Sequence, residues 1–304
     1  MTEPTLRILS LGAGVQSSTL ALLACEGALP GLDGAIFADT QAEPKAVYEQ
    51  VDRLEAELTK AGIPLYRVTV GSLRDDSINP SHRYASVPYF VRNPDGSEGM
   101  GRRQCTNEYK LQPIMRKCRE LLGASPPKFR TVPRGNVVEQ WIGFSTDEIH
   151  RANNRRENLY AIKRFPLLEL GMSRKDCIKW LDQRGWGHTV KSACTFCPFH
   201  GNRQWRDMRD NHPEDWADAV DFDRAIRNGG ARGLPLNGTA YLHRSRVPLD
   251  QAPIDHITRN EAKELRDELQ GDLFEIEEDG DPDGCSPFGC RSGEPVGPVD
   301  LDFP

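Results

Sequence analysis

A short apolar run, a glycine-rich turn and an apolar helix follow one another at the start of the chain, and this order constrains the fold more than any other feature. Residues 6–11 are mostly apolar, the turn at residues 12–14 contains two glycines, and residues 16–24 form a helical pattern that ends at Gly27. Two further apolar runs, at residues 34–40 and 65–70, flank a helix predicted to begin at Pro44. Strands that alternate with helices favour parallel pairing, so we expect an α/β fold with a parallel sheet and helices on both faces.

The remaining chain divides by composition into three predicted parts. Residues 71–104 are rich in turn formers and lack periodicity, which predicts a long binding loop rather than scaffold. Helices are expected at residues 107–122 and after a capping box at Ser173 and Asp176, and a strand at 140–145. The predicted organisation is an α/β core over residues 1–165, a smaller and mostly helical portion over 166–270, and an acidic Gly/Pro-rich tail over 271–304.

Charge is unevenly distributed along the chain. The net charge is −6, yet residues 102–164 contain 14 lysines and arginines against 6 acidic residues, and residues 250–304 contain 16 acidic residues against 4 basic ones. A basic middle suits an anionic substrate such as a nucleotide or a nucleic-acid backbone. The N-terminus lacks the features of a signal peptide, and no apolar run reaches the roughly 18 residues of a membrane span. We therefore expect a cytoplasmic protein without membrane contact.

The glycine turn has the chemistry of a phosphate site, because backbone N–H groups and the positive end of a helix dipole meet there. Three interpretations compete. A Walker loop needs a lysine that this turn lacks, and a dinucleotide fingerprint needs a glycine where Ser17 stands, although Asp39 resembles its ribose-binding acid. In the third, the hydroxyls of Ser10, Ser17 and Ser18 act with the amides to hold a pyrophosphate.

In this third form residues 10–18 resemble the PP-loop enzymes of the adenine nucleotide alpha-hydrolase-like superfamily, and among them the phosphoadenosine phosphosulfate (PAPS) reductase family with its ATP pyrophosphatase-type sulfurtransferase branch. The usual motif is Ser-Gly-Gly-x-Asp-Ser, and Gln16 replaces its aspartate here. Three further segments resemble the same family in the same order: residues 37–44, 105–113 and 141–151. The resemblance spans roughly residues 6–200 and implies the fold of that superfamily.

The resemblance also implies ligands and roles. An adenine nucleotide, ATP with Mg²⁺ or PAPS, would bind at Ser10, Gly12, Ala13, Gly14, Gln16, Ser17, Ser18, Asp39 and Thr40. Catalytic roles fall to Lys110 and Arg151, which would face the phosphates, and to Glu148. ATP would adenylate an acceptor for sulfur transfer, as in tRNA or DNA thiolation, with sulfur from a donor protein. Alternatively, a thiol would reduce PAPS, although the usual Glu-Cys-Gly-x-His ending of such reductases is absent. A non-catalytic, metal-stabilised nucleotide- or nucleic-acid-binding module is the third possibility.

Eight cysteines in a reducing compartment are not expected to form disulfides. Cys25, Cys118 and Cys177 each fall on the apolar face of a predicted helix, which is typical of core thiols.

The other five cysteines lie in predicted loops and are candidate metal ligands. Cys194 and Cys197 form a Cys-x-x-Cys, a spacing that lets both sulfurs reach one metal ion or one cluster edge. Cys105 and one of the tail pair, Cys285 or Cys290, would complete four thiolates. The resemblance implies a [4Fe–4S] cluster, and zinc or a redox-active dithiol remain alternatives.

Overall fold

A five-stranded parallel sheet forms the centre of the protein. The computed structural model describes residues 3–82, 87–152, 158–229, 236–259 and 261–262. The strand order is β3-β2-β1-β6-β7, and every neighbouring pair is parallel. The strands are β1 (Leu6–Leu11), β2 (Gly34–Ala38), β3 (Leu65–Val68), β6 (Val138–Trp141) and β7 (Ala161–Arg164). The predicted α/β class is confirmed.

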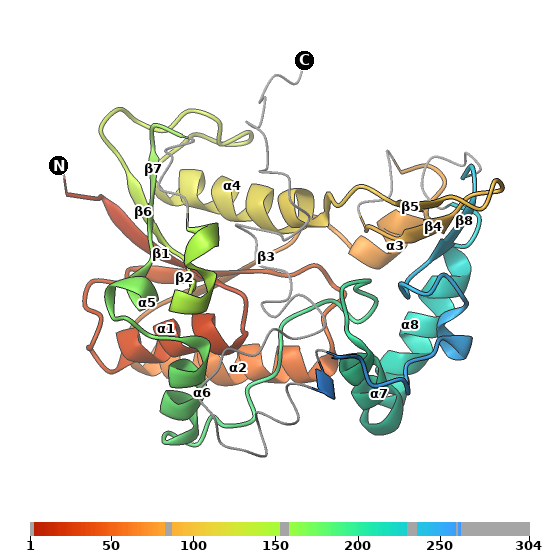
Figure 1. Ribbon diagram of the computed structural model, residues 1–304. Coiled ribbons are helices and arrows are strands. Elements are labelled where there is room, and N and C mark those ends of the chain that lie inside the picture. Colours follow the sequence, from red (N-terminus) through yellow and green to blue (C-terminus); the bar gives the residue numbers. More distant parts are fainter. Residues whose placement is uncertain (1–2, 83–86, 153–157, 230–235, 260, 263–304) are drawn as a thin grey trace.

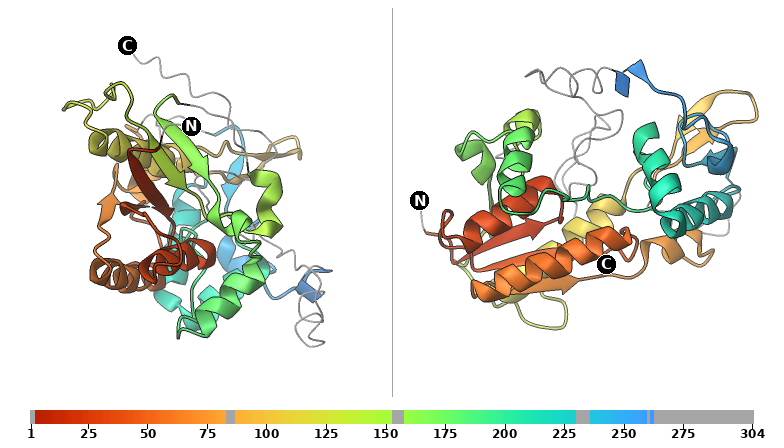
Figure 2. Two further views of the ribbon diagram at one scale, coloured as in Figure 1. Left: turned by 90° about the vertical axis from the view of Figure 1, so that its left-hand side faces the viewer. Right: turned by 90° about the horizontal axis from the view of Figure 1, so that it is seen from below.

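Helices cover both faces of this sheet (Figure 1, Figure 2). Leu9 of β1 joins a core formed with α1 and α2, whereas its neighbour Ile8 packs in a separate core with Ile114 and Cys118 of α4. Side chains alternate between the faces of a strand, so an apolar run such as β1 requires helices on each side. In Figure 1, α4 lies above the sheet and α1, α2 and α6 below it. The bounds are α1 (Val15–Cys25), α2 (Lys45–Lys60), α4 (Gln112–Leu121), α5 (Pro166–Glu169) and α6 (Arg174–Asp182).

The strand order creates a switch point between the neighbouring strands β1 and β6. After β1 the chain continues to β2, toward one edge of the sheet, and after β6 it continues to β7, at the other edge. Ligands of open α/β sheets bind at the carboxyl ends of the strands beside such a point. The loop after β1 holds residues 12–14, and the loop after β6 holds residues 142–145. The two loops touch, since a Cβ on Gly143 would lie 3.1 Å from the backbone nitrogen of Ser17. A side chain at residue 143 would require the backbone at the start of α1 to shift by a few tenths of an ångström.

A second core lies beside the main sheet and rests on a small antiparallel sheet in the order β5-β4-β8. Trp205 and Phe222 are fully buried in it. Its elements are α3 (Leu73–Ile78), β4 (Phe90–Arg92), β5 (Glu98–Met100), α7 (Asn202–Asn211), α8 (Pro213–Ala225), β8 (Thr239–Tyr241) and the short helix η3 (Leu249–Gln251). The interpretation of residues 71–104 as a loop without regular elements was wrong, because α3, β4 and β5 are too short to produce a readable period.

Several predicted boundaries shift in the structure. The capping box is confirmed, with Ser173 Oγ accepting from Asp176 N at 3.1 Å at the start of α6. The expected strand at 140–145 ends at Trp141, because the following residues form the loop at the switch point. The helix expected at 107–122 begins as a π-helix, η1 (Thr106–Leu111), before α4.

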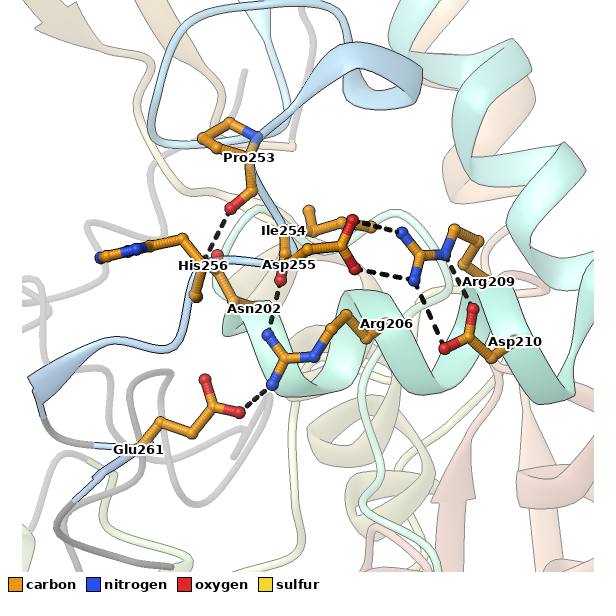
Figure 3. A network of polar contacts seen from close by, with 9 residues as sticks. All are labelled: Asn202, Arg206, Arg209, Asp210, Pro253, Ile254, Asp255, His256 and Glu261. Carbon is orange, nitrogen blue, oxygen red and sulfur yellow. Dashed lines mark hydrogen bonds and ion pairs between the residues drawn. The ribbon is translucent and has the colours of Figure 1, made fainter.

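The segment after η3 is fastened to α7 (Figure 3). Asn202 Nδ2 donates to the carbonyl of His256 at 2.8 Å, and Arg209 pairs with Asp255 at 2.8 Å. Arg206 pairs with Glu261. Residues 263–304, which hold the predicted tail, lie outside the described residues, and the division at residue 165 stays a prediction. Within the described ranges, no helix combines the length and apolar character required to cross a bilayer.

Candidate functional site

The glycine turn closes around the start of α1. Ser17 Oγ accepts from the backbone N–H of Gly12 at 3.2 Å and donates to the carbonyl of Gly14 at 3.3 Å. Ala13 has a φ of 61° and is fully buried, so the turn is tightly shaped. No side chain of the described residues caps the helix, and its first turn contains no acid. The N-terminal end of α1 therefore presents its positive dipole at the switch point with no acidic side chain in its first turn.

The three predicted serines differ in their surroundings. Ser10 is 6% exposed, and its hydroxyl has no hydrogen-bond partner among the described residues. A buried hydroxyl without a partner calls for one, such as an ion or a ligand. Ser18 is fully buried, and its hydroxyl accepts from Gln50 Nε2 at 3.4 Å, in the contact between α1 and α2. Ser10 and Ser17 thus lie at the turn, whereas Ser18 holds the two helices together.

A polar chain links the turn to the loop after β6. Gln16 Nε2 donates to Glu148 Oε2 at 3.0 Å, and Glu148 pairs with Arg151 within the short helix η2 (Thr146–Arg151). On the other side, Arg174 at the start of α6 donates to Gln16 Oε1 at 3.3 Å. The Arg151 side chain is 8% exposed and lies over the Phe144 ring. Glu148 therefore orients both Gln16 and Arg151, a positioning role at the edge of the turn.

The end of β2 supplies the next pair of predicted residues. Asp39 Oδ1 accepts from the backbone N–H of Gln41 and from the Tyr48 hydroxyl, both at 2.8 Å. Burial, and then the hydrogen bond to Asp39, raises the pKa of the Tyr48 phenol, so it remains a donor at neutral pH. The Asp39 carboxylate is fixed in place and partly accessible, as a contact to a ribose requires.

Thr40 belongs to a buried polar cluster that includes Lys110. Lys110 Nζ lies 3.1 Å from Glu43 Oε1, and the two side chains are only 8% and 1% exposed. Glu43 Oε1 also lies 3.5 Å from Thr40 Oγ1 and 3.9 Å from Cys194 Sγ. The second carboxylate oxygen, Oε2, has no partner within the described part of the chain. This cluster brings the end of β2, the π-helix η1 and the Cys-x-x-Cys together.

The three loop cysteines within the described residues share one core. Cys105, Cys194 and Cys197 are thiols and not disulfides, and each is less than 8% exposed in the second core. His200 Nε2 lies 2.9 Å from the carbonyl of Cys194, so this histidine supports the turn. No three His, Cys, Asp or Glu side chains among the described residues form a metal-binding group.

The two remaining candidate ligands, Cys285 and Cys290, lie outside the described residues. The metal centre, whether [4Fe–4S] or zinc, stays a prediction.

The turn and the cysteines are neighbours. A Cβ on Gly14 would lie 3.7 Å from the backbone nitrogen and Cβ of Ser192, two residues before Cys194. Sequence reasoning missed Ser192 and Arg174, for which no motif gave a signal. Glu43 lies inside residues 37–44, a segment that resembles the family, so the resemblance could have identified it as a site residue.

The core thiols give a direct test of the cysteine assignments. Cys118 and Cys177 are fully buried, and Cys25 is partly buried against the first core, as predicted. Burial raises the pKa of the Cys118 thiol and of the Cys177 thiol to about 12, so at about pH 8 only roughly one thiol in ten thousand is ionised. We expect both to resist iodoacetamide in the native protein and to react in urea, read by mass spectrometry. Rapid native labelling of either would contradict this packing.

No family model matches this chain, and no curated protein matches it.

Proposed function

We propose that this chain is a PP-loop enzyme that binds ATP and adenylates an anionic acceptor with release of pyrophosphate, as a step in sulfur transfer. One observation carries the proposal. The uncapped N-terminus of α1 lies at the switch point of a parallel sheet, directly after the buried hydroxyl of Ser10, which has no partner among the described residues. Together these groups offer donors to phosphate oxygens at a turn whose sequence lacks a Walker lysine.

The proposed chemistry is mainly positioning and charge neutralisation. An acceptor oxygen attacks the α-phosphorus, the bond to the oxygen that bridges to the β-phosphate breaks, and pyrophosphate leaves. The amides of residues 13–17 and Ser17 Oγ would hold the leaving pyrophosphate, while Arg151 and Lys110 supply positive charge. Glu148 would hold Arg151 in position, and Mg²⁺ bound to ATP would share the negative charge.

PAPS reduction is the second candidate, and a specific contact favours it. Cys194 Sγ lies 3.6 Å from Thr40 Oγ1, at the end of β2, and Ser192 of the same segment packs against the glycine turn. A thiol so close to the proposed nucleotide edge has the location that attack on a sulfonucleotide requires.

The two reactions release different products. We would incubate the full chain under anaerobic conditions with ATP, with and without RNA or DNA, and measure pyrophosphate. Parallel samples with PAPS and a dithiol would be assayed for sulfite. Pyrophosphate that rises with an acceptor supports adenylation, sulfite supports reduction, and nucleotide binding without either product supports a non-catalytic module.

Removing one hydroxyl of the turn tests the phosphate site. We expect Ser17→Ala to weaken ATP binding about tenfold, because a hydrogen bond to a charged group contributes roughly 1.5–3 kcal/mol. Calorimetric titration measures the dissociation constant, and Ser125→Ala, at an exposed loop position, is the matched control. If the two variants bound ATP with equal affinity, the glycine turn would not be part of the ATP-binding site.

A further inference from the structure

Basic side chains greatly outnumber acidic ones on α4 and on the connection from α4 to β6. Residues 116–134 contain six basic side chains and one acid, Glu120, in a chain of net charge −6. We call these six the basic surface: Arg116, Lys117, Arg119, Lys128, Arg130 and Arg134. Four of them are exposed: Arg116, Lys128, Arg130 and Arg134. This surface lies on the side of the sheet opposite α1 and α2 (Figure 1).

The connection is braced against α4. Arg119 Nε donates to the carbonyl of Phe129 at 2.6 Å, and Arg119 Nη1 donates to the Tyr160 hydroxyl at 3.0 Å. Phe129 has a φ of 46°, a left-handed conformation that a bulky residue rarely adopts, and the Arg116 guanidinium lies 5.7 Å from its ring. Lys128 and Arg130 flank this held residue. The charges of Lys128 and Arg130 therefore lie on a segment whose backbone is held in place by Arg119.

The arrangement of the basic surface fits a polymeric anion. Its cations are spread along a helix and the segment that follows it, and each exposed one is available to a different phosphate. A small anion needs donors that converge on one point, whereas a duplex offers about one charge per 1.7 Å along its axis. Guanidinium groups beside aromatic rings, as at Arg116 and Phe129, also suit contact with sugars and bases.

We propose that the basic surface binds the phosphodiester backbone of a nucleic acid. If the proposed function holds, this nucleic acid is the acceptor, and that assignment rests on the proposed function. Lys110 precedes α4 and reaches the buried cluster at Glu43, whereas Lys128 and Arg130 follow the other end of α4. A ten-residue helix is about 15 Å long. An acceptor that touches both ends must span at least about this length.

The test compares two charge reversals of equal size. Lys128→Glu with Arg130→Glu changes the basic surface, and Lys60→Glu with Lys179→Glu changes exposed positions on α2 and α6. Fluorescence anisotropy of the full chain with labelled RNA hairpin, duplex DNA and single-stranded DNA gives the affinities. We expect the first variant to lose about tenfold or more in affinity and about two in the slope of log K against log salt. The control should change by less than about twofold.

Equal losses in both variants, or no binding by the unaltered protein at low salt, would overturn the proposal. Arg134→Glu is an independent second variant, expected to reduce the salt slope by about one. The three oligonucleotides distinguish RNA from DNA as the source of the backbone. ATP binding is measured on the same samples and should persist in all variants. If the unaltered protein did not bind ATP, only the proposed function would be contradicted. If the two charge-reversal variants had the same affinity for nucleic acid, only the role of the basic surface would be contradicted.

Discussion

Glu43→Ala is expected to lower the free energy of unfolding by about 3–5 kcal/mol, because it leaves the buried Lys110 ammonium without the carboxylate that lies 3.1 Å away. Both side chains are almost fully buried, so water cannot replace the lost partner. Urea unfolding followed by circular dichroism measures the change. Glu43→Gln, which keeps the shape and a hydrogen-bond acceptor, should cost less than Glu43→Ala.

A surface pair of the same chemistry provides the control. Lys60 Nζ lies 2.8 Å from Glu57, but these side chains are 71% and 38% exposed. We expect Glu57→Ala to change stability by about 0–1 kcal/mol. In a double-mutant cycle, Glu43→Ala and Lys110→Met should show a coupling energy, since the two charged groups lie 3.1 Å apart in a buried pair. Strict additivity would mean that the buried pair does not interact as the structure places it.

Gly143→Ala is the second substitution with a large expected effect. The added Cβ would lie 3.1 Å from the backbone nitrogen of Ser17 and 3.3 Å from the carbonyl carbon of Gln16, and backbone at the start of α1 cannot yield as a side-chain tip can. We expect a loss of stability of about 1–3 kcal/mol from overpacking. We also expect ATP binding to weaken by at least about tenfold, because the phosphate-binding amides move with the turn.

Gly99→Ala is the matched glycine control. Its added Cβ would lie 3.7 Å from Val91 Cβ, an ordinary contact, in β5 of the small sheet. Thermal unfolding and calorimetric titration of both variants separate the two effects. If Gly143→Ala bound ATP as tightly as Gly99→Ala, the contact between the two loops at the switch point would have no part in nucleotide binding.

The main sheet was predictable because its signals are local. The first three strands are short apolar runs, and an apolar helix follows each of the first two. This alternation of strands and helices was enough to indicate parallel pairing. The capping box at Ser173 was readable for the same reason, since two residues three positions apart decide it. The short elements at residues 73–78, 90–92 and 98–100 were not, because three to six residues cannot show a period.

The polar contacts of the candidate site depend on tertiary structure and were not predictable in detail. Glu43 and Lys110 are 67 residues apart, and Gln16 and Glu148 are 132 apart. Motif resemblance placed these residues near a nucleotide but did not pair them. Likewise, three hydroxyls looked equivalent in sequence, and only the packing of α1 against α2 distinguishes Ser18 from Ser10 and Ser17.

The π-helical segment η1 sets the angular phase between two charged features of the molecule. Each residue of a regular α-helix advances the chain by about 100° around the axis. Deleting Leu111, the residue between Lys110 and α4, would thus turn Lys110 relative to α4 by about that angle. The ion pair inside the protein and the cationic side of α4 outside it would then lose their common orientation. One helical rod with a π-helical start thus carries both an interior ion pair and an outer cationic face.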